Sequence, residues 1–155
     1  MSICAVIVSY RTGPTLSACL DALSRVTRLD EIVLVDNGNE AAEAQALDEF
    51  AGADARARLL RGQGNVGFAA ACNLGGATAR SDVLVFVNPD VLLEADALVR
   101  LATALAAAPP PAIVGGDLRN LEGRPERGSR RERLTLWRAF VAFSGLSRLE
   151  RVAPA

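Results

Sequence analysis

The sequence contains no histidine and no lysine, and all 17 of its basic residues are arginine. The missing histidine excludes Ser-His-Asp and Cys-His catalysis, and any histidine-ligated metal site, within this chain. The missing lysine excludes a P-loop lysine, a Schiff-base lysine and the strand lysine of protein kinases. Chemistry in this chain must therefore rest on carboxylates, arginines, amides, backbone groups or a bound metal.

The sequence also lacks long apolar segments and a cysteine framework. Although 50% of the residues are hydrophobic, no apolar run approaches the roughly 18 residues that a membrane span needs, and the N-terminus does not resemble a signal peptide. The 3 cysteines, at positions 4, 19 and 72, are odd in number and far apart, which predicts reduced thiols in a cytoplasmic protein. The net charge of -1 gives no reason to expect nucleic acid as a partner.

Short strand-like runs alternate along the chain with segments of helical spacing. Runs rich in valine, isoleucine and leucine predict strands over 3–8, 32–35, 58–61, 83–87 and 112–114. Helical spacing predicts helices over 16–23, 40–51, 92–107 and 134–149, and one more after the glycines of 62–67. We expect Thr12 or Thr15 to cap the first helix, and Glu122-Gly123 to form a hairpin turn. The alternation predicts an α/β fold, with a Rossmann-like, mostly parallel sheet and helices on both faces.

The stretch from 82 to 90, which reads DVLVFVNPD, is the most informative one. Its unbroken apolar run predicts a central strand that is buried on both faces, and Pro89 ends that strand because proline cannot donate to a ladder. Asp90 is therefore expected at the carboxyl end of a strand, where ligands bind in open α/β sheets. The alternative is that Asp90 merely caps the helix predicted to follow.

Two other residues with suitable chemistry follow predicted strands. Tyr10 comes after the first strand, and Asp36 comes after the second, within a DNGN tetrad that is typical of a turn. An aromatic ring can stack on a base, an acid can accept from the N–H of a pyrimidine, and a second acid can hold Mg²⁺ or Mn²⁺ against phosphates. Together with Asp90, these residues predict a pocket for a nucleoside diphosphate.

The glycines at 62, 64 and 67 match the spacing of a dinucleotide-binding loop. This match favours an NAD-dependent oxidoreductase as one alternative function. However, the loop lies at the third strand–helix junction, whereas the dinucleotide fingerprint lies at the first. The other interpretation is a loop whose glycines only relieve backbone strain.

Five segments in order, VIVSYR, VDNGN, GNVGFAAACNLG, VFVNPDVLL and VGGDLRNLEGRPERGSRR, carry a family resemblance. With these motifs the chain resembles bacterial family 2 glycosyltransferases of the GT-A fold, and within them the rhamnosyltransferases that build cell-envelope polysaccharides. The resemblance implies a UDP- or dTDP-sugar donor, a glycan acceptor and inversion at the sugar. The donor-binding residues that it implies are Tyr10, Asp36, Asn65, Gly67, Asn73, Asn88 and Asp90. Asp90 matches the metal-binding acid of the family's Asp-x-Asp signature and implies Mg²⁺ or Mn²⁺, while Asn88 replaces the first acid.

The resemblance also implies a domain organisation. Residues 1–131 match the nucleotide-sugar-binding domain, and 132–155 are left as a C-terminal amphipathic helix and tail. Family members are usually longer, and their second half carries the acceptor-binding segment and the general base. Nothing after residue 131 resembles that segment, and Asp117 and Glu122 lie outside the matching motif, so no catalytic base is assigned. The alternatives are therefore an active enzyme and a truncated, non-catalytic module that binds a nucleotide sugar.

An apolar stripe is expected on the helix predicted over 134–149. It comprises Leu134, Trp137, Phe140 and Val141, and arginines flank it. The stripe predicts packing on the protein itself, association into a homodimer, or contact with an anionic membrane surface. The expected location is accordingly the cytoplasm, either free or at the inner face of the membrane.

Overall fold

The computed structural model describes residues 1–126, in which strands and helices alternate. The elements are β1 (Ile3–Ser9), α1 (Thr15–Ser24), β2 (Glu31–Asp36), α2 (Ala41–Ala53), β3 (Ala57–Leu60), α3 (Phe68–Thr78), β4 (Val83–Val87) and α4 (Ala97–Ala107). The chain divides after Val114 into two compact units, and all of these elements belong to the first. The domain boundary and the helix that the sequence predicts beyond residue 131 lie outside the described residues.

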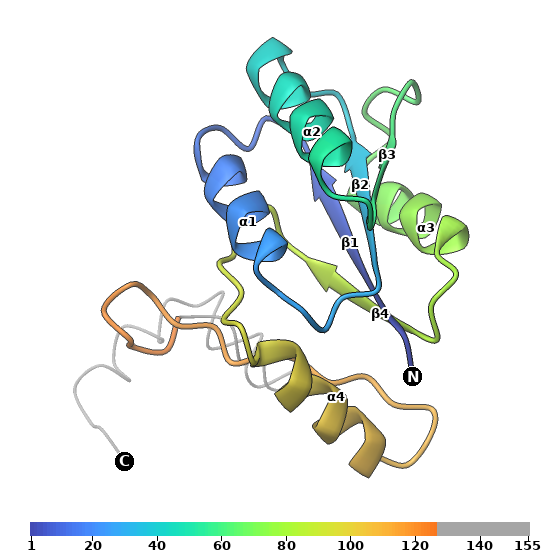
Figure 1. The fold of residues 1–155 in the computed structure, drawn as a ribbon, viewed down its shortest axis with the longest axis vertical. Helices are drawn as coiled ribbons and strands as arrows, with labels where there is room; N and C mark the ends of the chain where they lie inside the picture. Colours follow the sequence, from blue (N-terminus) through green and yellow to red (C-terminus); the bar gives the residue numbers. More distant parts are fainter. Residues whose placement is uncertain (127–155) are drawn as a thin grey trace, which may run out of the picture. The chain divides into compact units, whose positions relative to one another are not determined.

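The strands form a parallel sheet in the order β3-β2-β1-β4 (Figure 1). The register pairs Ser9 of β1 with Asp36 of β2, and Ile7 of β1 with Val87 of β4. The carboxyl ends of β1, β2 and β4 therefore meet at one edge of the sheet. The predicted α/β fold with a parallel sheet is confirmed.

Helices cover both faces of the sheet, as predicted. On one face, α1 and α2 pack over a core that includes Ile7, Leu34 and Leu47, and Leu98 of α4 belongs to the same cluster. On the other face, α3 packs over a second cluster that includes Val6 and Val35. All seven residues of β1 are buried because helices lie above and below it.

Gly75 lets α3 approach the sheet unusually closely. A Cβ added there would lie 2.5 Å from Cγ1 of Val6 and 3.1 Å from Cγ2 of Val35. No side chain fits in that gap, so the backbone of α3 rests directly on β1 and β2. This packing fixes the first residue of the helix, Phe68, near the carboxyl edge of the sheet.

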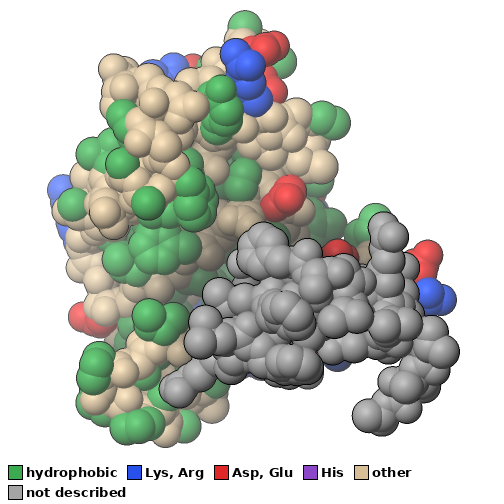
Figure 2. All heavy atoms as spheres, turned by 180° about the vertical axis from the view of Figure 1, so that it is seen from behind, with side chains coloured by type: hydrophobic (Ala, Val, Ile, Leu, Met, Phe, Trp, Pro, Cys, Tyr) green, Lys and Arg blue, Asp and Glu red, His purple; other side chains and the backbone are tan. Residues whose placement is uncertain are grey.

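β4 is not the doubly buried central strand that its apolar sequence predicts. It is the last strand of the described sheet, and its side chains alternate: Leu84 and Phe86 are 39% and 51% exposed, whereas Val87 is buried. The reason is that α3 packs mainly over β1 and β2, although Gly76 of α3 lies beside Leu84 and Phe86 of β4. Figure 2 shows apolar side chains exposed together on one face of the molecule.

The helix predicted over 92–107 begins later, at Ala97. Val91 and Leu93 pack against the core, while Leu92 between them is exposed. This alternation is typical of extended chain, which buries every second residue. Packing of the two flanking side chains therefore prevents an earlier helix start.

Two smaller expectations were also wrong. Residues 112–114 form no strand, and Ile113 is almost fully exposed with no neighbouring strand to pair with among the described residues. Neither threonine caps α1: the N-cap position is Pro14, and the Thr15 hydroxyl donates to the carbonyl oxygen of Thr12. The chain enters this helix through a turn at Gly13, whose φ of 73° suits glycine.

Within 115–126 the predicted turn at Glu122-Gly123 is present. The backbone N–H of Asn120 donates to the carbonyl oxygen of Arg124 at 2.9 Å, and Arg119 and Pro125 form an antiparallel bridge. Asp117 and Glu122 each form an ion pair with the arginine two residues further on. In the part of the chain that the structure describes, no helix combines the length and apolar character needed to cross a bilayer.

Candidate functional site

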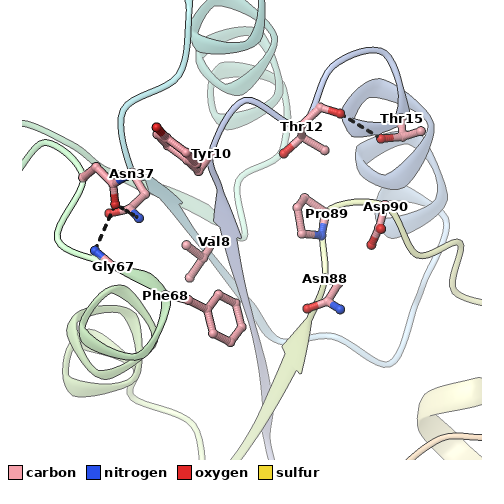
Figure 3. A pocket seen from close by; sticks show the side chains of 11 residues that line it. Val8, Tyr10, Thr12, Thr15, Asn37, Gly67, Phe68, Asn88, Pro89 and Asp90 are labelled. Atoms are coloured by element: carbon pink, nitrogen blue, oxygen red, sulfur yellow. Dashed lines mark hydrogen bonds between the residues drawn. The ribbon is translucent and has the colours of Figure 1, made fainter. Parts of the chain in front are cut away.

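A cavity of about 670 Å³ opens where the strands end. Its walls come from the residues that follow β1, β2 and β4, from the start of α1 and from the loop that leads into α3 (Figure 3). The lining residues are Val8, Tyr10, Thr12, Thr15, Asn37, Asn65, Gly67, Phe68, Asn88, Pro89 and Asp90. A volume of roughly 300–1,000 Å³ is usual for sites that bind small molecules.

The cavity brings together most of the residues that the sequence assigns to a donor site. The predicted residues that line it are Tyr10, Asn65, Gly67, Asn88 and Asp90, whereas Asp36 and Asn73 do not. The lining residues that sequence reasoning missed include Asn37, Phe68, Thr12 and Thr15. The role of each residue in binding stays a prediction.

Asp90 presents an exposed carboxylate to the cavity. It makes no hydrogen bond or ion pair with other described residues. It does not cap a helix, because α4 begins at Ala97, so the alternative interpretation of this acid was wrong. The Asn88 side chain also lines the cavity, which places a carboxylate and an amide oxygen within one turn of the chain.

Cys19 of α1 contacts the backbone of the segment 88–90. Its buried thiol donates to the carbonyl oxygen of Asn88 at 3.7 Å. Burial, and then the negative charge of Asp90, raises the pKa of Cys19 to about 11. The thiol therefore stays protonated at neutral pH and is not a nucleophile. All three cysteines of the chain are free, as predicted.

Asp36 is directed into its own turn. Its Oδ1 accepts hydrogen bonds from the backbone N–H groups of Gly38 and Asn39, at 3.2 and 3.0 Å, and from Nδ2 of Asn39 at 2.8 Å. Burial by itself raises the pKa of Asp36, but the hydrogen bonds from Asn39 and Gly38 and the charge of Arg61 outweigh it and hold the pKa below its ordinary value. The carboxylate is therefore ionised and organises the 36–39 turn.

Asn37 connects the end of β2 to the glycine-rich loop. Its side-chain Oδ1 accepts from the N–H of Val66 at 3.1 Å, and its Nδ2 donates to Oδ1 of Asn65 at 3.2 Å. Asn65 Oδ1 also accepts from the N–H of Gly67 at 3.0 Å. Asn37 is only 2% exposed, so these bonds hold the loop to the sheet. The sequence signal for Asn37 was hidden, because the DNGN tetrad predicts only a turn.

The glycines of this loop serve its backbone conformation. Gly62, Gly64 and Gly67 have φ values of 98°, 63° and 83°, a region that favours glycine. In a dinucleotide fingerprint the third glycine permits close helix–strand packing, whereas a Cβ on Gly67 would meet no atom within 4 Å. The loop also follows β3 instead of β1. This geometry favours the strain-relief interpretation over a dinucleotide site.

The cavity contains little charge of its own. Asp90 is the one charged side chain among the described residues that line it. The described residues also contain no group of three or more histidine, cysteine or acidic side chains that could hold a metal ion alone. Mg²⁺ and Mn²⁺ are commonly bound by one or two protein oxygens, with substrate phosphates supplying other ligands. Asp90 and Asn88 fit that shared mode of binding and do not fit an all-protein metal cage.

In open α/β sheets, ligands bind in the crevice at the carboxyl ends of the strands, and the described residues place an aromatic ring, amides and one acid there. The chain belongs to glycosyl transferase family 2, whose family model matches residues 4–151. The resemblance seen in the sequence motifs is thus confirmed at the level of the family.

Two curated relatives are longer glycosyltransferases. The uncharacterized glycosyltransferase EpsJ of Bacillus subtilis is 34% identical over 86 residues, which cover 55% of this chain and 25% of that protein. The glycosyltransferase GlyG of Streptococcus pneumoniae is 26% identical over 114 residues, which cover 73% of this chain and 38% of that protein. The matched part of the chain thus spans between a quarter and two fifths of these relatives.

Solved structures share the fold, and one of them is a mannosyltransferase. The mannosyltransferase PcManGT of Pyrobaculum calidifontis, in complex with GDP-Man and Mn²⁺, superposes with a TM-score of 0.62 at 21% identity, over 67% of this chain and 32% of that one. S. aureus TarS 1-349 gives a TM-score of 0.60 at 16% identity, over 68% of this chain and 32% of that one. The predicted GT-A fold is therefore confirmed.

Proposed function

We propose that the chain is the donor-binding part of an inverting glycosyltransferase that moves a sugar from a UDP- or dTDP-sugar to a polysaccharide or other glycan. The observation that carries the proposal is the carboxylate of Asp90, which has no hydrogen bond or ion pair with the described residues and shares one cavity with the ring of Tyr10 in a chain of this family. The ring suits a nucleotide base, and the acid suits a cation that the donor's phosphates would share.

The chemistry needs charge neutralisation more than it needs a nucleophile on the protein. In an inverting transfer, the acceptor hydroxyl attacks the anomeric carbon while the nucleoside diphosphate leaves with growing negative charge. Asp90 and Asn88 would hold Mg²⁺ or Mn²⁺, which when bound stabilises that charge as a Lewis acid. The neutral amides and hydroxyls of the cavity, such as Asn65 and Thr15, would orient the donor.

The general base is not assigned to any residue. Asp90 is the sole acid among the described residues of the cavity, and a carboxylate that binds a cation cannot also take the acceptor proton. The matched segments cover only 25% and 38% of the curated relatives. The second candidate function is a module that binds a nucleotide sugar without turnover, because no described residue of the cavity is left to act as the base.

The same proposal includes the kind of nucleotide sugar that serves as the donor and the cellular compartment of the protein. The motif resemblance favours a rhamnosyltransferase-like enzyme of cell-envelope polysaccharide synthesis that uses a uridine or thymidine nucleotide. Similar folds were solved with GDP-Man and with UDP-GlcNAc, so guanosine nucleotides belong in any test. Three free cysteines suit the reducing cytoplasm.

Nucleotide binding tests the proposal directly. The melting temperature of the chain would be measured with UDP, dTDP and GDP, each with and without Mn²⁺. We expect UDP or dTDP with Mn²⁺ to raise it, and Asp90→Ala to remove the metal-dependent part. Asp21→Ala is the matched control, because Asp21 is an acid of α1 with an exposed side chain that does not line this cavity. A panel in which no nucleotide shifts the melting temperature would refute the proposal.

Turnover then separates the enzyme from the binding module. The chain would be incubated with UDP- and dTDP-sugars and Mn²⁺, and release of the nucleoside diphosphate would be followed with and without glycan acceptors. Sustained release identifies an enzyme, whereas tight binding without release identifies a module.

A further inference from the structure

Phe68 is an exposed phenyl ring inside the cavity, and the fold does not account for its exposure. It is the first residue of α3 and is 59% exposed. The helix packs on the sheet through Ala71 and Gly75, which are both buried. Burying a phenylalanine is normally strongly favourable, so an open ring that lines a cavity is suited to contact with a ligand.

The two aromatic rings of the cavity lie on the side away from Asp90, with the amide of Asn37 beside Tyr10 (Figure 3). Figure 3 shows Tyr10 and Phe68 on one side of the cavity, with Val8 between them, and Thr12, Thr15 and Asp90 on the other side. The arrangement suits a ligand with a planar end for the rings and a polyanionic end whose charge a cation held at Asp90 would neutralise.

Both rings are attached to rigid parts of the fold. Tyr10 directly follows the fully buried strand β1, and the guanidinium of Arg11 lies 5.5 Å from the centre of its ring. Phe68 follows Gly67, whose N–H donates to Asn65 Oδ1 at 3.0 Å. The backbone that carries each ring is therefore anchored before a ligand arrives, which reduces the entropic cost of binding.

We propose that Phe68 is a second aromatic contact for the donor, so that Tyr10 and Phe68 together hold the nucleotide base and leave the diphosphate on the side of Asp90. This inference rests on the proposed function. It adds that Phe68 contacts the nucleotide base and that the base binds on the side of the cavity that carries the two rings. The other explanation is that additional polypeptide covers Phe68, in which case the ring has no part in nucleotide binding.

The test compares a ligand that has a base with one that has none. Titration calorimetry of the 155-residue chain with Mn²⁺ would measure the affinity for UDP and for inorganic pyrophosphate. Phe68→Ala should lower the affinity for UDP roughly 5- to 150-fold, which corresponds to the stacking energy of one base on an aromatic ring. The affinity for pyrophosphate should stay almost unchanged. Phe68→Tyr should restore UDP binding, because any aromatic face can stack.

Phe86→Ala is the matched control. Phe86 is a phenylalanine of similar exposure, 51%, that lies on β4 outside the cavity, so its loss should change neither affinity. The inference is overturned if Phe68→Ala binds UDP as the wild type does, or if it weakens UDP and pyrophosphate equally. If pyrophosphate binds too weakly to measure, Phe68→Tyr decides, since failure to restore UDP binding overturns the inference.

The two proposals fail in different ways. A wild-type chain that binds no nucleotide refutes the proposed function, and this inference with it. The other outcome is that the wild-type chain binds UDP with Mn²⁺, that Asp90→Ala abolishes this binding and that Phe68→Ala does not. This outcome leaves the proposed function intact and refutes only the role of Phe68.

Discussion

Gly75 and Gly76 are neighbours on α3, but a methyl group added to each would meet very different surroundings. At Gly75 it would lie 2.5 Å from Cγ1 of Val6, a residue of the fully buried strand β1. At Gly76 it would lie 3.2 Å from Cδ1 of Leu84, the flexible end of a half-exposed side chain on β4. The same substitution to alanine at both positions therefore tests how tightly α3 packs on the sheet.

Two opposing effects set the size of the change. Replacing glycine by alanine within a helix stabilises it by about 1 kcal/mol at either position, whereas overpacking a core costs about 1–3 kcal/mol. Val6 is β-branched, stiff at χ1 and enclosed, so Gly75→Ala should incur the upper part of that cost and lose about 1–2 kcal/mol net. Leu84 can rotate towards solvent, so Gly76→Ala should be neutral or stabilised by up to about 1 kcal/mol.

Thermal unfolding followed by far-UV circular dichroism measures the difference. The two variants should differ by about 1–3 kcal/mol, and for a protein of this size 1 kcal/mol corresponds to about 2–4 °C, so Gly75→Ala should melt roughly 2–12 °C below Gly76→Ala. Equal melting temperatures, or a Gly75→Ala variant that is the more stable of the two, would show that α3 does not rest on Val6 as described.

Two further predictions concern the loops at the two ends of the sheet. Asn37→Ala should lower the free energy of unfolding by about 1–3 kcal/mol, because it removes two side-chain hydrogen bonds of a buried amide; an unchanged urea midpoint would contradict this. The side-chain hydrogen bond from Arg56 is the main reason that the pKa of Asp54 lies below its ordinary 3.8. The resulting stabilisation is complete above that ordinary value and is lost as the pH falls through the lower folded pKa. Asp54→Asn should therefore be less stable than the wild type near neutral pH and approach it in acid, whereas a stability gap that stays constant down to about pH 2 would rule out this ionic contribution.

Local patterns in the sequence determined the fold class and much of the site. Apolar runs of strand length alternate with helical segments, and such alternation leads to a parallel sheet whose carboxyl ends share one edge. Residues that follow the strands closely, Tyr10, Asn88 and Asp90, are therefore expected at that edge, and all three line the cavity. Strand direction places these residues at the same edge, and the pairing of β1 with β4 brings them into one cavity.

Only the tertiary structure decided which side chains are covered and where they point. The apolar run of β4 looks like a buried strand, but Gly75 seats α3 over β1 and β2 and leaves Phe86 half exposed. Asp36 follows its strand as Asp90 does, yet backbone N–H groups of its own turn bind its carboxylate. Burial depends on which elements pack together, and side-chain direction after a strand depends on the hydrogen bonds available there; neither is encoded in the hydrophobic period of a single segment.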